Sequence, residues 1–424
     1  MRLAISTDLV AYDETVTAAP AKAGDAPLAR NVPGYIELSI FDELEDVKAD
    51  WRAFERHADC TVFQTFDWLD TWQRHIGTRH GVRPAIVVGH SEDGEIKFIL
   101  PLATSSSGFA RELVWLGSDL CDYNGPLLAE NFSLLFDKFQ FNKLWLRITE
   151  RLQSRPHLAY DLIRLEKMPA KIGSQRNPLL MLGVRRNPSG AYSTPIAGPW
   201  ERFYAAKRSS STRSRDRSKR KRLAEFGELA LVHPEGKSDA LASFNTLTQQ
   251  KARSFARMGV TNIFARPYYR KFYEALITDP RTRHIAHISR LDCGSQTAAV
   301  NLGLTFRDRY YHLQASHDDG ALSRLGPGAA HLHELLKYAI ERGFKFFDFT
   351  IGDERYKSDW CDNAEDLYDH VSFNNWRGAC LCAPLFVKDW LKRWIKQSPS
   401  LWKAFSRARA LYAAFSQRLK ARSG

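Results

Sequence analysis

The 424-residue sequence contains few cysteines and no apolar run long enough to cross a bilayer. Its six cysteines form no C-x-x-C pair and no Cys/His spacing typical of a metal site, so we expect reduced thiols and no bound metal. No apolar stretch approaches the ~20 residues that a membrane-spanning helix needs. The first residues also lack the long apolar segment of a secretory signal, and we therefore expect a cytoplasmic protein.

Two segments carry the positive charge of the chain. The net charge is +13, and residues 207–222 contribute nine Lys/Arg and one Asp, while residues 386–424 contribute ten Lys/Arg and one Asp. Together the two segments carry +17, which leaves −4 for the rest of the chain. This distribution indicates two local anion-facing surfaces rather than a body that binds nucleic acid.

A weak internal repeat indicates two copies of one α/β unit, in a chain too long for one ordinary core. Each copy reads as a helix followed by two strands joined by a glycine turn. The predicted helices are 67–76 and 267–278, and the predicted strands are 84–89, 96–102, 284–291 and 297–306. At an offset of 200 residues, Trp72 matches Phe272 and Gly94 matches Gly294.

The repeat divides the chain into four predicted segments. They are a loosely packed tail (1–34), a first α/β domain (35–190), a second α/β domain (195–383) and basic amphipathic helices (386–424). In the last segment, Phe386, Trp390 and Trp394 recur every four residues among basic residues. A face of this kind suits a membrane interface, and the alternative is that it packs onto the protein.

The most informative stretch lies between residues 310 and 360. An apolar strand (310–315) leads to a Gly326-Pro-Gly328 bend, an amphipathic helix that Gly343 closes, and a second apolar strand that carries Asp348. A glycine bend at a helix start leaves main-chain N–H groups unpaired beside the positive end of the helix dipole. We expect a phosphate-bearing cofactor over residues 323–330, and the alternative is a simple tight turn.

The first copy has no such bend. Its corresponding loop contains Asp119, Asp122, Tyr123 and Asn124, which either form an ordinary turn or shape an acceptor site. We therefore expect cofactor binding only in the second copy.

Four blocks of the second copy resemble the GNAT-type acyltransferases, in particular the CelD-like branch linked to cellulose and exopolysaccharide production, which is related to the FemAB-like aminoacyltransferases. The blocks are Pro199–Tyr204 with the basic run that follows, the helix holding Lys251–Phe255, Ser323–Gly328, and Phe347–Trp360. The resemblance covers about residues 35–380. It implies an α/β (α+β) fold of tandem GNAT-like domains, each a mixed, mostly antiparallel sheet flanked by helices.

The resemblance also implies an acyl-CoA donor, such as acetyl-CoA, and an N- or O-acyltransferase. With the glycines of its cofactor motif, Gln/Arg-x-x-Gly-x-Gly/Ala, aligned on Gly326 and Gly328, Ser323 takes the first place. The residues that would bind the cofactor are Ser323, Arg324, Gly326, Gly328 and Ala329. Ser323 departs from the motif, and Arg324 would supply the charge from the next position. Main-chain N–H groups near Leu313 to Ala315 would polarise the acyl carbonyl.

The resemblance further suggests residues for catalysis and for the acceptor. Asp348 or Glu354 would act as the base and Tyr356 as the acid, although Asp348 could instead be a structural acid. Asp122, Tyr123, Lys357 and Trp360 would contact the acceptor, a small molecule or a cell-envelope or exopolysaccharide sugar or its precursor.

Two other functions stay open at this point. One is a FemAB-like transferase, which would use aminoacyl-tRNA as the donor, and residues 207–222 would then bind tRNA. Otherwise residues 207–222 would form a solvated helix face, bind the 3′-phosphate of coenzyme A or bind a polyanionic acceptor. The other is a non-catalytic scaffold of a polysaccharide-synthesis machine. The departure of Ser323 from the cofactor motif supports this alternative.

Overall fold

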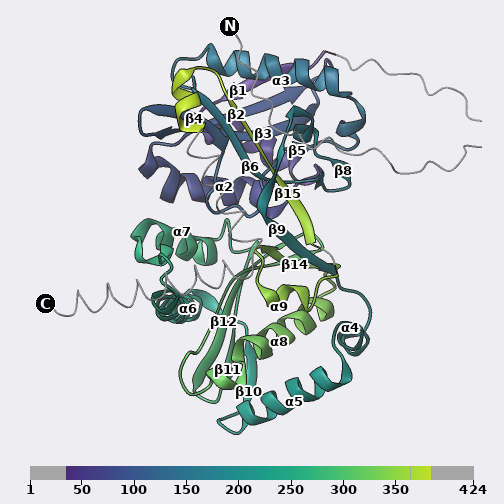
Figure 1. Ribbon diagram of the computed structural model, residues 1–424, viewed down its shortest axis with the longest axis vertical. Coiled ribbons are helices and arrows are strands. Elements are labelled where there is room, and N and C mark those ends of the chain that lie inside the picture. Colours follow the sequence, from purple (N-terminus) through teal and green to yellow (C-terminus); the bar gives the residue numbers. More distant parts are fainter. Residues whose placement is uncertain (1–34, 363, 383–424) are drawn as a thin grey trace, which may run out of the picture. The chain divides into compact units, whose positions relative to one another are not determined.

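The computed structural model describes residues 35–362 and 364–382. Within them the chain forms two compact units, and neither is a continuous segment (Figure 1). Unit one consists of residues 35–60, 82–187 and 367–382, and unit two of residues 61–81 and 188–366. The predicted tail (1–34) and the predicted basic helices (386–424) lie outside the described residues.

Unit one is a mixed sheet flanked by helices. Its strands run in the order β1-β2-β3-β4-β6-β15, and neighbouring strands pair antiparallel except β4 and β6, which are parallel. The strands are β1 (Glu37–Phe41), β2 (Arg83–His90), β3 (Ile96–Ser107), β4 (Ala110–Trp115), β6 (Leu162–Pro169) and β15 (Ala364–Phe373). Short strand β5 (Leu127–Leu128) pairs with β3, and β7 (Lys171–Ile172) pairs with β8 (Gln175–Arg176). The helices are α1 (Leu44–Phe54) and α3 (Lys138–Gln153).

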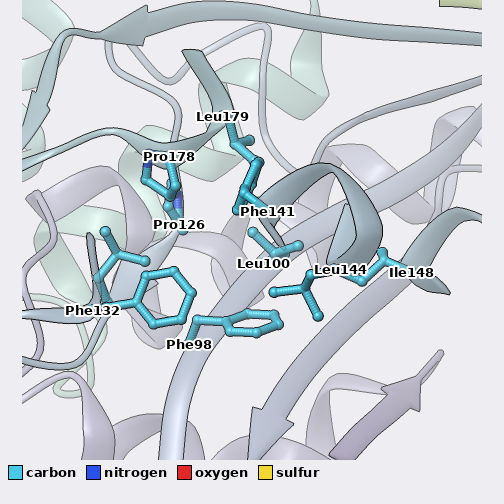
Figure 2. A pocket seen from close by; sticks show the side chains of 10 residues that line it. Phe98, Leu100, Pro126, Phe132, Phe141, Leu144, Ile148, Pro178 and Leu179 are labelled. Atoms are coloured by element: carbon cyan, nitrogen blue, oxygen red, sulfur yellow. The ribbon is translucent and has the colours of Figure 1, made fainter. Parts of the chain in front are cut away.

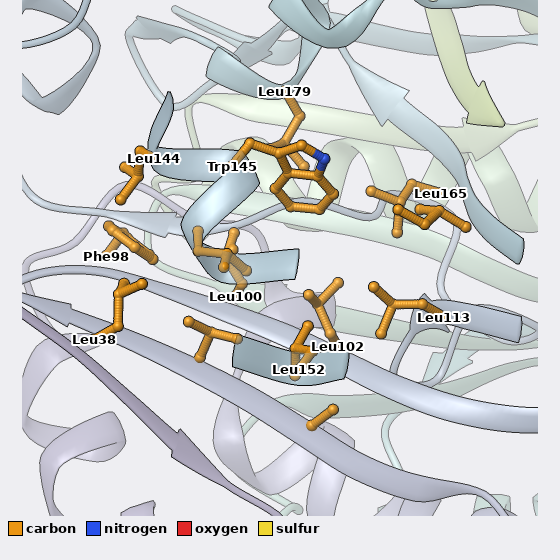
Figure 3. Packing of buried hydrophobic residues seen from close by; sticks show 14 of the residues in the cluster. Leu38, Phe98, Leu100, Leu102, Leu113, Leu144, Trp145, Leu152, Leu165 and Leu179 are labelled. Atoms are coloured by element: carbon orange, nitrogen blue, oxygen red, sulfur yellow. The ribbon is translucent and has the colours of Figure 1, made fainter. Parts of the chain in front are cut away.

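Helix α3 shows how the sequence builds the core of unit one. Its start is a capping box, in which the Asp137 carboxylate accepts a hydrogen bond from the Gln140 N–H at 2.8 Å and the Gln140 side chain accepts one from the Asp137 N–H at 3.0 Å. Its buried side chains recur at helical spacing, namely Phe141, Leu144, Trp145, Ile148 and Leu152. They belong to one core cluster with Leu100, Leu102 and Leu113 of the sheet (Figure 3).

A small apolar cavity lies in this core (Figure 2). Its volume is about 10 Å³. Its lining consists of Phe98, Leu100, Pro126, Leu128, Phe132, Phe141, Leu144, Ile148, Pro178 and Leu179. A space of this size holds at most one water, and the lining side chains offer it no polar partner. The cavity is therefore a packing defect and not a ligand site.

In unit two the strands run in the order β9-β14-β13-β12-β11-β10, and neighbouring strands pair antiparallel except β13 and β14, which are parallel. The strands are β9 (Arg185–Pro195), β10 (Leu229–Val232), β11 (Ala286–Cys293), β12 (Gln296–Phe306), β13 (Arg309–His317) and β14 (Phe346–Ile351). The helices are α2 (Phe66–Trp72), which continues as a π-helical turn (Gln73–Gly77), α4 (Trp200–Lys207), α5 (Ser210–Ala224), α6 (Gly236–Met258), α7 (Pro267–Thr278), α8 (Pro327–Glu341) and α9 (Arg355–Ser358). Figure 1 shows α6 and α7 on one side of β11 and β12, and α8 on the other.

The two halves of the chain repeat one order of elements, as the sequence predicted. In each half an edge strand and two helices precede three antiparallel strands, and a long helix then leads to a strand that returns parallel to the last of them. The predicted helix 267–278 is α7. The fold class is therefore confirmed as α/β, with a large mixed and mostly antiparallel sheet flanked by helices.

The compact units differ from the predicted domains 35–190 and 195–383 by two exchanges. Helix α2 belongs to unit two, where Trp68 meets Phe272 of α7 edge to face with ring centroids 5.1 Å apart. Strand β15 follows the strands of unit two in sequence but pairs with β6 of unit one, and β9 pairs with β14 of unit two. Hydrophobic periodicity predicts the type of an element but not its partner, so the sequence could not show these exchanges.

No helix in the described ranges is long and apolar enough to span a membrane.

Candidate functional site

The parallel strands β13 and β14 of unit two separate part-way along their length. Their pairing covers three residue pairs and ends at Tyr311 and Asp348, whereas β13 continues to His317 and β14 to Ile351. Beyond Tyr311, within the described chain, no strand pairs with the edge of β13 that faces β14. The main-chain groups of this edge are therefore open to a partner other than a strand.

A bulge in β13 coincides with the separation. In the pairing of β13 with β12, two residues, His312 and Leu313, stand opposite one, Gly303. A bulge of this kind bends its strand and increases the local twist. The bend accounts for the loss of contact with β14 directly after Tyr311.

Helix α8 begins with an open amino terminus. Gly326 has a φ of 69°, in the left-handed region that favours glycine, and Pro327 occupies the first helical position. The Ala330 N–H makes the first helical hydrogen bond, to the Gly326 carbonyl at 3.1 Å, and no side chain caps the helix. The N–H groups of Gly328 and Ala329 therefore have no acceptor in the described part of the chain. This geometry matches the predicted glycine bend and makes the start of α8 a candidate anion site.

Basic groups surround the start of α8. A Cβ built on Gly326 would lie 3.9 Å from Nζ of Lys219 on α5, and one built on Gly328 would lie 3.3 Å from Nδ1 of His317. Ser323 and Arg324 are exposed in the turn that precedes the helix. Neither Lys219 nor Arg324 has an ion-pair partner among the described residues. Lys219 therefore places, from another element, a cation beside Gly326.

Asp348 is buried and paired. Its Oδ2 accepts a hydrogen bond from Nη1 of Arg309 at 2.9 Å, and its Oδ1 accepts one from the Thr350 N–H at 2.8 Å. Thr350 has a φ of 60°, where a non-glycine residue is strained, and the register of β14 with β9 shifts between Asp348 and Thr350. The carboxylate thus holds an irregular stretch of β14. These contacts fit the structural alternative for Asp348, and its role as a base stays a prediction.

The side chain of Lys357 also binds the end of β14. Its side chain is 4% exposed, and Nζ donates to the Ile351 carbonyl at 2.9 Å and pairs with Glu354 at 2.9 Å. The ammonium group is thus held by its own strand end, and the contact of Lys357 with an acceptor stays a prediction. Glu354 is exposed apart from this ion pair.

Tyr356 lies beside the point where the strands separate. Its ring centroid is 6.5 Å from that of His312 and 6.2 Å from that of Phe349. Burial raises the pKa of Tyr356, and the negative charge of Glu354 raises it further. The hydroxyl therefore stays protonated, as the predicted acid requires.

Trp360 belongs to an aromatic cluster rather than to an open surface. It is 6% exposed, and its ring stacks on Phe203 and on Tyr204 of α4. The Arg208 guanidinium lies 5.2 Å from its ring centroid. Its ring thus packs within its own unit, and the contact of Trp360 with an acceptor stays a prediction.

Asp122 and Tyr123 lie in unit one. Tyr123 is buried, and the neighbouring Asn124 donates to the Glu166 carbonyl at 3.0 Å. This loop is thus anchored to the end of β6. Its predicted contact with an acceptor stays a prediction.

Two residues that the sequence did not single out as catalytic lie at the same place. His312, in the β13 bulge, is 7% exposed, and burial lowers its pKa to about 3, with Lys357 and Lys251 adding to the effect. Burial lowers the pKa of Lys251, on α6, to about 8, and Glu354 opposes that shift. The bulge that places His312 has no marker in the sequence, although Lys251 lies in one of the blocks that carry the resemblance.

Unit one lacks the open helix terminus. Its equivalent helix, α3, starts with the carboxylate of Asp137 on the Gln140 N–H. A bound anion would have to displace this carboxylate and would meet its negative charge. We therefore place the candidate site in unit two alone. Across the described ranges, no group of three or more His, Cys, Asp or Glu side chains is arranged to hold a metal ion.

Comparison with known families bears directly on this part of unit two. A family model described as an acetyltransferase (GNAT) domain matches residues 210–358, from α5 to α9. The matched residues include the start of α8 and the separated ends of β13 and β14. These residues are therefore similar to a GNAT-type domain, and the first half of the chain repeats their order of elements. No curated protein matches the sequence.

Solved structures of other proteins are similar to this chain at low sequence identity. FemX is 13% identical, with a TM-score of 0.53 over 80% of this chain and 95% of its own. L-PGS from Bacillus licheniformis is 13% identical, with a TM-score of 0.43 over 72% of this chain and 91% of its own. A tandem GNAT protein of clavulanic acid biosynthesis is 10% identical, with a TM-score of 0.43 over 80% of this chain and 98% of its own. The likeness to FemX concerns the fold alone.

Proposed function

We propose that the protein is an acyl-CoA-dependent N- or O-acyltransferase, with acetyl-CoA as the first donor to test. One observation carries the proposal. A helix start with two unbonded N–H groups directly follows a strand that has separated from its parallel neighbour, within a GNAT-type domain. The helix start suits the diphosphate of the donor, and the open edge of β13 suits its amide-bearing arm and acyl carbonyl.

The charges around α8 support a diphosphate rather than a neutral ligand. The N–H groups of Gly328 and Ala329 would donate to its oxygens, with the positive end of α8 behind them. Lys219 and Arg324 would add two cations that have no partner in the described chain. A serine at position 323 is then tolerable, because the missing cation comes from α5.

Acyl transfer from a thioester depends mainly on how the donor carbonyl and the acceptor are positioned. Holding the thioester carbonyl beside an amine or hydroxyl turns a bimolecular step into a local one. Tyr356, whose pKa is raised by burial, would return a proton to the departing thiolate. The acceptor is proposed to be a cell-envelope or exopolysaccharide sugar or its precursor. This part rests on the resemblance of residues 199–372 to the CelD-like branch.

Calorimetry with the intact protein tests the donor. Acetyl-CoA should bind with one site per chain, and acetyl-pantetheine, which lacks the diphosphate and the nucleotide, should bind at least about tenfold more weakly. Equal affinity for the two ligands, or no binding of acetyl-CoA, would exclude the diphosphate site and with it the proposal.

A second candidate function is transfer from aminoacyl-tRNA, and helix α5 favours it. The helix carries seven Lys/Arg and one Asp over Ser210–Ala224, and only Leu223 is buried. Gel shifts with tRNA at several salt concentrations separate the candidates. A tRNA-dependent enzyme should bind tRNA with an affinity that falls steeply as the salt concentration rises. This function assigns no role to the start of α8. The scaffold alternative instead predicts that neither ligand binds.

Contact of residues 386–424 with a membrane stays a prediction from their sequence. Flotation with anionic vesicles should recover the full chain and not a chain that ends at residue 385. Equal recovery of both would exclude membrane docking by this segment.

A further inference from the structure

His312 is the first residue of β13 after its pairing with β14 ends. The last pair of that pairing joins Tyr311 and Asp348, and His312 follows directly, in the bulge opposite Gly303. The residue is 7% exposed. His312 therefore lies where the two strands separate, on the strand whose main-chain edge is open.

Aromatic rings from the separated end of β14 surround the imidazole. The ring centroids of Phe347 and Phe349 lie 6.0 Å and 6.2 Å from that of His312. Tyr356, which follows β14, meets the imidazole edge to face at 6.5 Å. Phe349 also meets the Tyr356 ring, at 6.2 Å. Because these rings are in contact, a group that enters between the strands and reaches Tyr356 also reaches His312.

The imidazole of His312 makes no hydrogen bond or ion pair with the rest of the described chain, although it is more than nine-tenths buried. Other buried histidines of unit two are bonded. His287 lies 2.8 Å from the Tyr310 hydroxyl, and His331 lies 3.2 Å from Oγ of Ser289. Buried polar groups almost always have a hydrogen-bond partner. The unbonded imidazole at an open strand edge therefore indicates a partner that is a ligand.

His312 is suited to donate one hydrogen bond and not to take up a proton. Burial lowers its pKa to about 3, and the charges of Lys357 and Lys251 add to the effect. At neutral pH the ring is therefore uncharged and carries a single N–H. A group that stays neutral is a weak base, but its N–H can stabilise a negative charge that forms beside it.

The length of the donor's arm matches the distance from the start of α8 to His312. His317, five positions further along β13, marks the start of α8, because its Nδ1 would lie 3.3 Å from a Cβ built on Gly328. Five residues of an extended strand span about 16 Å. The arm of coenzyme A has about 13 chain atoms from phosphate to sulfur, the length of about four extended residues, or ~15 Å. A diphosphate at Gly328 therefore puts the thioester carbonyl at the level of His312.

We propose that His312 is a catalytic residue of the acyl transfer, which donates a hydrogen bond from its ring N–H to the carbonyl oxygen of the bound acyl group. This inference rests on the proposed function. As the acceptor's nitrogen or oxygen bonds to the acyl carbon, the carbonyl π electrons move onto the oxygen, and the hydrogen bond from His312 strengthens with the negative charge.

The remaining steps leave the imidazole unchanged. The C=O bond forms again as the C–S bond breaks, and coenzyme A departs as a thiolate. The thiolate takes the phenolic proton of Tyr356, and the Tyr356 phenolate takes the proton that the acceptor loses. His312 keeps its proton throughout.

A distance measurement on the unmodified protein tests the contact without knowledge of the acceptor. The protein carries ¹⁵N in its histidine rings, binds acetyl-CoA with ¹³C at the carbonyl, and is studied by solid-state ¹³C–¹⁵N dipolar NMR. A ring nitrogen should lie within about 4.2 Å of the labelled carbon, the sum of a hydrogen bond and a C=O bond. The absence of any ring nitrogen within about 5 Å would overturn the inference.

Two variants assign this distance to one residue. His312→Gln should abolish the ¹³C–¹⁵N coupling, because glutamine has no labelled ring. The control is His57→Phe in unit one, which replaces an exposed histidine that meets the ring of Phe54 at 5.6 Å. It should leave the coupling intact. Coupling that persists in His312→Gln would show that another histidine makes the contact, and would overturn the inference.

A second measurement compares two ligands by calorimetry. S-ethyl-CoA has a thioether in place of the thioester and therefore lacks the carbonyl. The unmodified protein should bind acetyl-CoA about fivefold or more tightly than S-ethyl-CoA, the contribution of about one hydrogen bond. His312→Phe, which keeps an aromatic ring but loses the N–H, should reduce this ratio at least about threefold. A purely structural role would weaken both ligands equally, so an unchanged ratio would contradict the proposal.

The outcomes separate this inference from the proposed function. If calorimetry with the unmodified protein detects no binding of acetyl-CoA, the proposed function fails, and the inference fails with it. If acetyl-CoA binds but no histidine nitrogen lies near its carbonyl carbon, only the inference fails. The distance measurement uses the unmodified chain, so it decides the question even if His312→Phe does not fold.

Discussion

Arg309 and Asp348 join the two ends of the short β13–β14 pairing. Arg309 is in its first residue pair and Asp348 in its last, and Nη1 of Arg309 lies 2.9 Å from Oδ2 of Asp348. The Asp348 side chain is 3% exposed and that of Arg309 29%. The ion pair thus holds the strands together up to the point where they separate.

Loss of this ion pair should destabilise unit two. Asp348→Ala should lower the free energy of unfolding by about 2–3 kcal/mol, because it removes a charged hydrogen-bond partner in a buried place and leaves the buried Thr350 N–H without its acceptor. Urea denaturation measures the change. The control is Asp308→Ala, which removes an exposed pair with Lys345 at 3.7 Å and should cost less than about 0.5 kcal/mol. Equal losses in the two variants would contradict the structural role, and lost turnover with unchanged stability in Asp348→Asn would favour the base.

Substitution of the two glycines at the ends of α8 distinguishes an effect on backbone strain from an effect on donor binding. Gly326 has a φ of 69° and Gly343 a φ of 79°, so alanine at either position should cost about 1 kcal/mol of stability. Only Gly326→Ala should also weaken acetyl-CoA binding, by about fivefold or more, since it alone alters the start of the helix. Calorimetry and thermal unfolding of the two variants provide the comparison. Equal affinities would argue against a diphosphate at this terminus.

Lys219 should strengthen donor binding by its charge. Lys219→Ala should raise the Kd for coenzyme A about five- to tenfold at low ionic strength, and the difference should shrink as salt screens the charge. Lys221→Ala, on the same exposed helix but without the contact at Gly326, is the control. A salt-independent loss, or the same loss in both variants, would argue against a direct charge interaction.

A buried histidine makes the stability of unit two sensitive to acid. Burial lowers the pKa of His331 on α8 from 6.5 to about 3, and the charges of His312, His287 and His233 add to the shift. Between these two values the unfolded chain binds a proton that the folded chain does not. Stability is therefore full above pH 6.5 and falls as the pH falls, by about 2 kcal/mol from this residue at pH 5.

His331→Gln tests this sensitivity. Glutamine can keep the hydrogen bond with Oγ of Ser289, now 3.2 Å from Nε2 of His331, but it does not titrate. The variant should lose about 2 kcal/mol less than the unmodified protein between pH 7.5 and pH 5, as measured by urea denaturation. An unchanged pH dependence would show that His331 is not the group responsible.

The sequence predicted those parts of the fold and site that depend on local patterns. Alternating and helical apolar spacing predicted the paired strands and helix α7, and the glycine bend predicted the start of α8. Contacts between distant segments were not predictable in this way. Nothing near position 348 indicates that Arg309 neutralises the acid, and nothing near position 357 indicates that the lysine holds the end of its own strand. The cation beside Gly326 likewise comes from a residue more than one hundred positions away.

The late position of β15 in the chain constrains how the protein can be made. Residues 35–187 leave the ribosome before residues 367–373, which pair with β6 of their sheet. The edge of β6 therefore stays uncovered until unit two has been synthesised. A fragment cut after residue 190 would keep that uncovered edge permanently. Expression of the first half alone should therefore yield aggregates, and supplying residues 364–382 as a carboxy-terminal extension should restore a soluble fold.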